Sequence, residues 1–152
     1  MPDNKDLLEL YKQHQAGQDK YTYFLLAAAG AAIGFAVQKT EGLQFSWWLT
    51  PAGFAIVCWG FSFYYGCKNL TWVQTANYAN YSLLQLQSGV HPEQPPHPQL
   101  TDAAISGVSK ALNSNATKAQ FFGTWQFRML ITGAVFFIGW RLLEMARLTY
   151  AA

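Results

Sequence analysis

The sequence predicts an all-α integral membrane protein with three transmembrane helices, and the distribution of its charges is the main reason. Of the 152 residues, 12% are charged and 51% are hydrophobic, whereas about 25% are charged in an ordinary soluble domain. Residues 21–38 and 42–67 carry no charge, and residues 119–140 carry only Arg128. Since a membrane helix needs about 20 mainly apolar residues, these stretches are read as three spans of a single domain. The composition argues against a disordered chain and against a soluble enzyme.

Residues 3–16 precede the first apolar stretch and are expected to form a short amphipathic helix. Leu7, Leu8 and Tyr11 share one side of it. Such a helix either lies on the membrane surface or packs on the protein's own bundle, and the pattern fits both arrangements. Gly17 is expected to end it.

The first predicted transmembrane helix, residues 21–38, is rich in alanine and glycine. Gly30 and Gly34 lie about one turn apart and form a pair of small residues at i and i+4. In lipid, such pairs let two helices approach closely. We therefore predict helix packing through this face, either within the chain or between subunits.

The second predicted span, residues 51–67, follows a short aromatic link. Trp47 and Trp48 are expected at the membrane interface, where amphipathic aromatic rings gather. Thr50 precedes Pro51 and is expected to cap the helix, with the proline at the first helical position.

Three side chains within this second span have distinctive chemistry. Cys58 and Cys67 are nine residues apart on one helix, a rise of about 13.5 Å, which is too long for a disulfide. Trp59 is expected to need a hydrogen-bond partner for its indole N–H, because the residue lies deep in the span.

The helix is expected to continue beyond the second span through residues 68–88, because no proline or glycine intervenes before Gly89. Gly89 is the expected C-terminal cap. Apolar side chains recur along this segment at the three- and four-residue spacing of a heptad seam. They are Trp72, Ala76, Ala79, Leu83 and Leu86. Since no residue from 69 to 92 is charged, the segment is expected to be covered by a hairpin helix, by a second subunit or along a polar vestibule.

Residues 89–101 are expected to form a proline-rich loop outside the membrane, because four of the six prolines fall between residues 92 and 98. Thr101 and Asp102 are expected to cap a helix over residues 102–112.

A break or kink is expected at residues 113–115, where the sequence reads Asn-Ser-Asn, and a long helix is expected over residues 116–148. That helix would be about 50 Å long, more than one bilayer, and would include the third span. Its first part is therefore expected to stand outside the membrane beside residues 68–88, as an antiparallel membrane-proximal stalk.

The third span carries charged residues that need an explanation. Arg128 is expected at the cytoplasmic interface, because helical side chains lean toward the helix N-terminus. Arg141 leans away from its nearer interface, and Glu144 follows three residues later as an available partner. Either Arg141 sits at a thinned outer interface, or it forms a paired, protein-facing charge site with Glu144.

The basic residues predict the orientation of the chain in a cell membrane, which we expect to be a bacterial inner membrane. Seven of the ten Lys and Arg residues fall before the first span or within residues 68–128, and three fall on the other side. The positive-inside rule then places the N-terminus and the stalk in the cytoplasm of a multi-pass protein.

The sequence contains none of the motifs that would indicate an enzyme: no phosphate-binding glycine loop, CxxC, HExxH or GxSxG. We therefore expect no catalysis, no cofactor and no metal, and a net charge of +2 is too small to indicate nucleic acid. A chain of this size can hardly enclose a pore alone. The expected function is that of a self-associating protein of the lipid bilayer, channel-like or membrane-perturbing. The alternative is an accessory, assembly or immunity subunit that binds another membrane protein.

Overall fold

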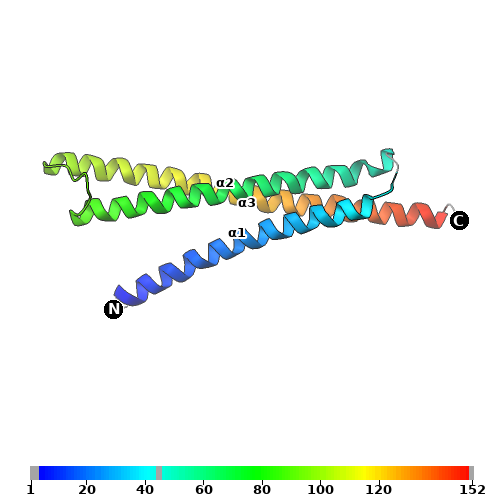
Figure 1. The fold of residues 1–152 in the computed structure, drawn as a ribbon, viewed down its shortest axis with the longest axis horizontal. Helices are drawn as coiled ribbons and strands as arrows, with labels where there is room; N and C mark the ends of the chain where they lie inside the picture. Colours follow the sequence, from blue (N-terminus) through cyan, green and yellow to red (C-terminus); the bar gives the residue numbers. More distant parts are fainter. Residues whose placement is uncertain (1–3, 44–45, 151–152) are drawn as a thin grey trace. The chain divides into compact units, whose positions relative to one another are not determined.

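The computed structural model describes residues 4–43 and 46–150, and every regular element in these ranges is helical. The prediction of an all-α protein is therefore confirmed. In chain order the elements are α1 (Asn4–Thr40), the short 3-10 turn η1 (Trp47–Leu49), α2 (Thr50–Ser88) and α3 (Pro98–Tyr150) (Figure 1).

The chain forms two compact units, which are described one at a time. The first comprises Met1–Cys67 together with Gly123–Ala152, and the second comprises Lys68–Phe122. The first unit thus contains α1, the start of α2 and the end of α3, and the second contains the remaining parts of α2 and α3.

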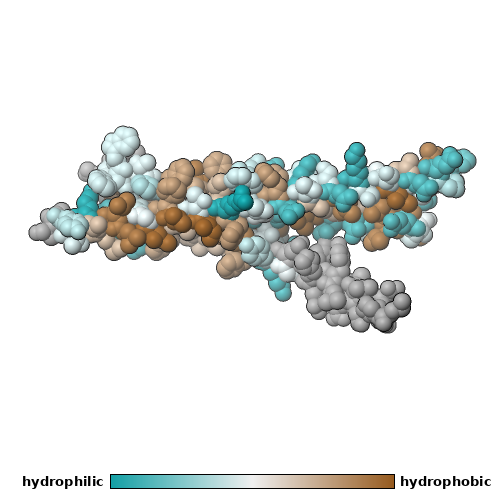
Figure 2. Space-filling view, turned by 180° about the vertical axis from the view of Figure 1, so that it is seen from behind, coloured by the Kyte–Doolittle hydropathy of each residue, from teal (hydrophilic) through white to brown (hydrophobic). Residues whose placement is uncertain are grey.

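Two helices among the described residues are long and apolar enough to cross a membrane: α1, through its Asp19–Thr40 part, and α3. Three were expected, and the remaining one, the second predicted span, is not confirmed. Its residues, 51–67 of α2, carry no charge, but glycine, serine, tryptophan and tyrosine residues lower their hydropathy. In the face that Figure 2 shows, hydrophobic side chains form a broad patch over the part of the surface that holds the first unit.

Two predicted helix breaks are wrong. α1 continues through Gly17, because a glycine inside a helix costs only about 1 kcal/mol relative to alanine. The helix predicted over residues 3–16 is thus the first part of α1, and the side chains that would test its amphipathic character lie outside the described residues. α3 continues through residues 113–115, where Asn115 is half-buried rather than in a turn.

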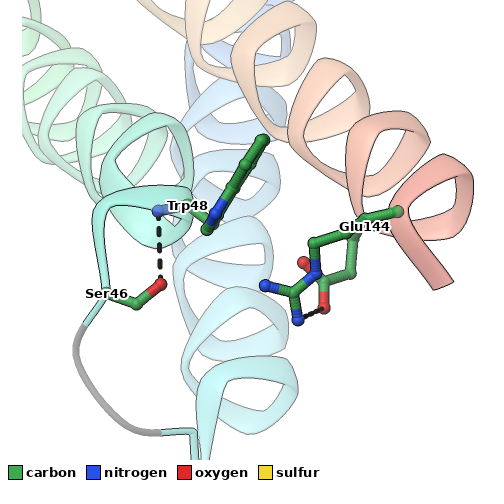
Figure 3. Close-up of polar contacts among 4 residues, drawn as sticks. Ser46, Trp48 and Glu144 are labelled. Atoms are coloured by element: carbon green, nitrogen blue, oxygen red, sulfur yellow. Dashed lines mark hydrogen bonds and ion pairs between the residues drawn. The ribbon is translucent and has the colours of Figure 1, made fainter. Parts of the chain in front are cut away.

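The start of α2 differs from the prediction in one respect. Ser46, not Thr50, is the capping residue: its backbone is extended (φ −142°, ψ 159°) and its side chain accepts a hydrogen bond from the Trp48 backbone N–H (Figure 3). Thr50 already has helical angles (φ −53°, ψ −45°). One turn of 3-10 helix therefore precedes Pro51, so the helical segment begins earlier than a threonine-proline signal suggests.

α3 also begins earlier than residue 102, where the sequence predicts its start. The helix begins at Pro98, and the backbone N–H groups of Leu100 and Thr101 both donate to the carbonyl of His97 at 3.0 Å. A proline is well suited to a first helical turn, because its missing N–H has no partner to lose there. Thr101 therefore lies within the first turn and Asp102 directly after it, so neither precedes the helix as a cap.

The end of α2 agrees with the prediction. The helix runs without interruption through residues 68–88 and ends at Gly89, which has a positive φ of 72°. The Gly89 N–H donates to the carbonyl of Leu86 at 3.3 Å, and the Val90 N–H donates to that of Gln85 at 3.1 Å. These two bonds form a Schellman motif, which satisfies helix-end carbonyls and favours glycine.

Within the second unit, the α2 and α3 segments form an antiparallel hairpin. Asn69 Nδ2 donates to the Ala119 carbonyl at 2.6 Å, and the Lys118 ammonium lies 4.2 Å from the centre of the Trp72 ring. Leu86 is buried, and the other four residues predicted for the seam are half-buried. Residues 68–88 were expected to pack against a hairpin helix, against a second subunit or along a polar vestibule. The structure shows the hairpin helix.

Candidate functional site

An aromatic and alanine core joins the three helices in the first unit. Its buried members are Ala36, Ala52, Ala55, Trp59, Phe137 and Trp140. The alanines come from α1 and α2, and their small side chains leave room for the large rings. The Phe137 ring lies at the centre, 5.5 Å from the Trp59 ring and 5.4 Å from the Trp140 ring between centroids.

Trp59 of α2 packs into a slot on α3 that glycine creates. Its indole Nε1 donates to the carbonyl of Leu130 at 3.1 Å, which supplies the partner that the sequence led us to expect. A Cβ at Gly133 would lie 2.6 Å from this nitrogen and 3.0 Å from the backbone oxygen of Ala55. The absence of a side chain at Gly133 therefore lets the indole reach the α3 backbone.

In a second contact, a large side chain of α3 packs against a glycine of α2. Gln126 of α3 is 1% exposed and packs against Gly66 of α2, where a Cβ would lie 2.5 Å from its Nε2. Ser62 of α2 is fully buried, and its Oγ donates to the Gln126 backbone carbonyl at 2.8 Å. The Gln126 Nε2 itself has no acceptor within the described part of the chain.

These contacts form a polar layer, which we define as Trp59, Ser62 and Gln126. All three side chains are neutral at physiological pH, so the layer donates and accepts hydrogen bonds and does not exchange protons. Trp59 and Ser62 donate from their side chains to backbone carbonyls of α3, whereas Gln126 accepts through its backbone carbonyl, and such bonds between helices stabilise helix association in lipid. The layer therefore holds α2 and α3 in one register.

The predicted glycine pair of α1 lies away from these contacts. Gly30 and Gly34 are exposed, and nothing in the described structure lies within 4 Å of a Cβ built at either position. Ala29 and Ala36 supply the packed side of α1 instead, and both are fully buried. The described residues thus show no packing of the glycine pair within the chain, and packing between subunits stays a prediction.

The structure does not pair Arg141 with Glu144. The Glu144 carboxylate pairs with Arg147 at 3.4 Å (Figure 3), and the Arg141 guanidinium lies 5.6 Å from the Trp140 ring. An acidic residue placed before a basic one along a helix is the more favourable order, which explains why Glu144 selects the later arginine. Arg147 also lies 5.9 Å from the Trp48 ring.

The three residues predicted at the membrane interface are all exposed. Trp47 is 90% exposed and Trp48 is 51% exposed, both on η1. Arg128 is exposed on α3, with its guanidinium 5.6 Å from the Trp125 ring.

The sequence did not lead us to Ser62, Gly66, Gln126 or Gly133, although it contains a signal for the first two. The predicted seam began at Trp72, but buried positions of α2 recur at the same three- and four-residue spacing further toward its N-terminus. They are Ala52, Ala55, Trp59, Ser62, Gly66 and Asn69. Extended backwards from Trp72 with one change of phase, two successive steps of three to Asn69 and Gly66, the spacing reaches Ser62 and Trp59, the α2 half of the polar layer.

No metal site is found among the described residues, in which no group of three or more His, Cys, Asp or Glu side chains gathers. Cys58 is buried, Cys67 is exposed, and neither forms a disulfide. Comparison of the chain with protein-family models, with curated proteins and with solved structures finds no match.

Proposed function

We propose that this chain is a non-enzymatic membrane protein that associates with itself in the bilayer, as a channel-like or membrane-perturbing effector. The observation that carries the proposal is the position of Gly30 and Gly34. Both lie in the middle of a candidate membrane span, on a side of α1 that no other described part of the chain covers. In lipid, small residues on a helix surface let the backbone of another helix approach closely, which favours association of the two helices.

In this proposal α2 also crosses the membrane, through residues 51–67. The segment is uncharged, and within the first unit it packs against both candidate spans, in a core that holds Ala36 of α1 and Phe137 of α3. Even without Arg128, six basic residues lie before the first span or within residues 68–118 and three lie on the other side, which supports a cytoplasmic N-terminus in an inner membrane.

Mass measurement of the purified protein in lipid discs tests self-association. The wild type is expected to form one defined oligomer that conducts ions in liposomes. Gly34→Leu is expected to reduce the mass toward that of a monomer without unfolding the chain, because Gly34 is exposed and a Cβ there has no described neighbour within 4 Å.

Gly60→Leu is the matched control, since Gly60 is equally open but lies on α2. This variant is expected to keep the wild-type mass. A monomeric wild type, or an oligomer unaffected by Gly34→Leu, would exclude the glycine face as the subunit contact.

A second function, that of an accessory, assembly or immunity subunit, is favoured by the surface of the hairpin. Tyr78 is 72% exposed, Tyr81 59% and Leu84 56%, on a helix segment without charges. Exposed apolar side chains gathered on one element mark sites of protein association. This function predicts a small, non-conducting protein in detergent that enlarges only when its partner is present.

A further inference from the structure

Arg128 stands on a side of α3 that the rest of the first unit leaves uncovered. It is exposed, as are the apolar residues that follow it on the same outward stripe: Ile131 is 47% exposed, Val135 63% and Ile138 58%. The stripe therefore resembles a lipid-facing surface with one cation in it.

The contacts between α2 and α3 place this arginine at a definite level along the bundle. The hydrogen bonds from Ser62 to Gln126 and from Trp59 to Leu130 bracket it, so Arg128 lies level with residues 60–61 of α2. The uncharged run of α2 continues from there to Cys67. At 1.5 Å per residue, about 9 Å of uncharged helix lies on that side alone.

The contacts of α1 also place Arg128 far from the charged ends of the helices. Leu26 and Gln126 both adjoin Gly66, so Arg128 lies about two residues further along α1 than Leu26. The nearest charges of α1 are Lys20 on one side and Lys39 on the other. They are separated from this level by about 12 Å and about 16 Å of helix rise.

The side chains described in the first unit offer Arg128 no carboxylate at this depth. Their acidic residues are Asp19, Glu41 and Glu144. Of these, Asp19 is nearest in level and is still about 13 Å away along the helix axis. A charged side chain in the hydrocarbon region is costly, and such residues are found paired or facing water.

We propose that Arg128 is an intramembrane docking residue that pairs with a carboxylate on a transmembrane helix of a different membrane protein. The inference rests on the second proposed function, and it names the site and the chemistry of the partner. A second copy of the chain does not supply the counter-charge, because residues 21–38 and 51–67 are uncharged and residues 119–140 contain no acidic residue.

Two other surroundings for Arg128 fit the structure less well. A water-filled lumen needs a polar lining, whereas Ile131, Val135 and Ile138 on this stripe are apolar. A lipid phosphate would have to be reached by snorkelling. The guanidinium does lean toward Trp125, three residues earlier, but that gains only about 4.5 Å of the distance.

The probe for this proposal is a synthetic transmembrane peptide of leucine and alanine with one aspartate at its centre. Its association with the full-length protein is measured by energy transfer in discs of zwitterionic phosphatidylcholine. We expect the aspartate peptide to bind at least tenfold more tightly than the same peptide with leucine at the centre, or with the aspartate near one end. The preference is expected to be lost in Arg128→Leu and kept in Arg141→Leu, which removes an exposed arginine further along the same helix.

Equal binding of the three peptides to the wild type would overturn the proposal, as would a preference that survives Arg128→Leu. Discs that contain phosphatidylglycerol form the second arm. If anionic lipid raises the melting temperature of the wild type but not of Arg128→Leu, and the aspartate peptide gives no such effect, the residue binds a headgroup and the proposal fails. A partner that enlarges the protein equally with and without Arg128 would leave the second function standing while overturning this site.

Discussion

Gly133→Ala tests whether the slot on α3 holds Trp59 in place. The new Cβ would lie 2.6 Å from the indole Nε1, 2.7 Å from Cδ1 and 3.0 Å from the Ala55 backbone oxygen. The Trp59 ring is 4% exposed and surrounded by the core, and the Ala55 oxygen moves only if α2 itself moves. The helices must therefore separate, or the indole must leave its site.

The expected loss of stability combines three terms. Overpacking of a filled core costs about 1–3 kcal/mol, and loss of the hydrogen bond from Trp59 to Leu130 costs about 0.5–1.5 kcal/mol. Alanine regains about 1 kcal/mol because it is the better helix former. The net effect is a destabilisation of about 0.5–3.5 kcal/mol, measured by chemical unfolding in detergent micelles with helical circular dichroism as the signal.

Gly139→Ala is the control on the same helix, since a Cβ there meets nothing within 4 Å. It is expected to leave stability unchanged or to raise it by up to about 1 kcal/mol. In a Trp59→Ala background, Gly133→Ala is expected to lose most of its cost, because the ring it displaces is gone. Equal effects of Gly133→Ala and Gly139→Ala, or an unchanged cost without Trp59, would refute the slot.

Three further outcomes are expected. Trp59→Phe and Trp140→Phe remove the same atoms, but only the Trp59 indole has a hydrogen-bond acceptor among the described residues, so Trp59→Phe should be the more destabilising by about 1 kcal/mol in the same unfolding assay. Leu86→Asp puts a charge at a position that is 5% exposed and should lower stability by about 3–5 kcal/mol, whereas Gln87→Asp at the exposed neighbouring position should cost far less; similar losses would contradict the packed seam. A cysteine at Gln94, in a background without the two native cysteines, should react with a membrane-impermeant thiol reagent only from the cytoplasmic side, and labelling from the outside would overturn the proposed orientation.

The helical class, the continuation of α2 past Cys67 and the end of that helix at Gly89 could be predicted, because each depends on local properties of the chain. An uncharged apolar run, the absence of helix breakers and a glycine before a polar loop act over a few residues. The breaks at Gly17 and residues 113–115 were predicted on the same local grounds and were wrong. At both places the preferences of glycine, serine and asparagine against a helix are weak, at most about 1 kcal/mol per residue, and the helix continues through them.

The polar layer was harder to predict, because it depends on which residues of α2 and α3 lie at the same level. Gln126 and Gly133 have no local feature that distinguishes them from Gln120 or Gly139 of the same helix. Their roles depend on which residues of α2 lie opposite them, and the residues near Gln126 and Gly133 in the sequence do not indicate this. The pairing of Glu144 is local by contrast: two arginines lie three residues from it, and the order of acid before base favours Arg147 over Arg141, whose pairing with Glu144 was one of two alternatives.

The two glycine contacts also limit how the length of these helices can vary. Trp59 and Gly66 are seven residues apart on α2, and so are Gln126 and Gly133 on α3. A single residue inserted between either pair would turn one contact by about 100° relative to the other, so both could not form together. Chains that diverge from this one are therefore expected to change residues within these two intervals far more readily than they gain or lose them.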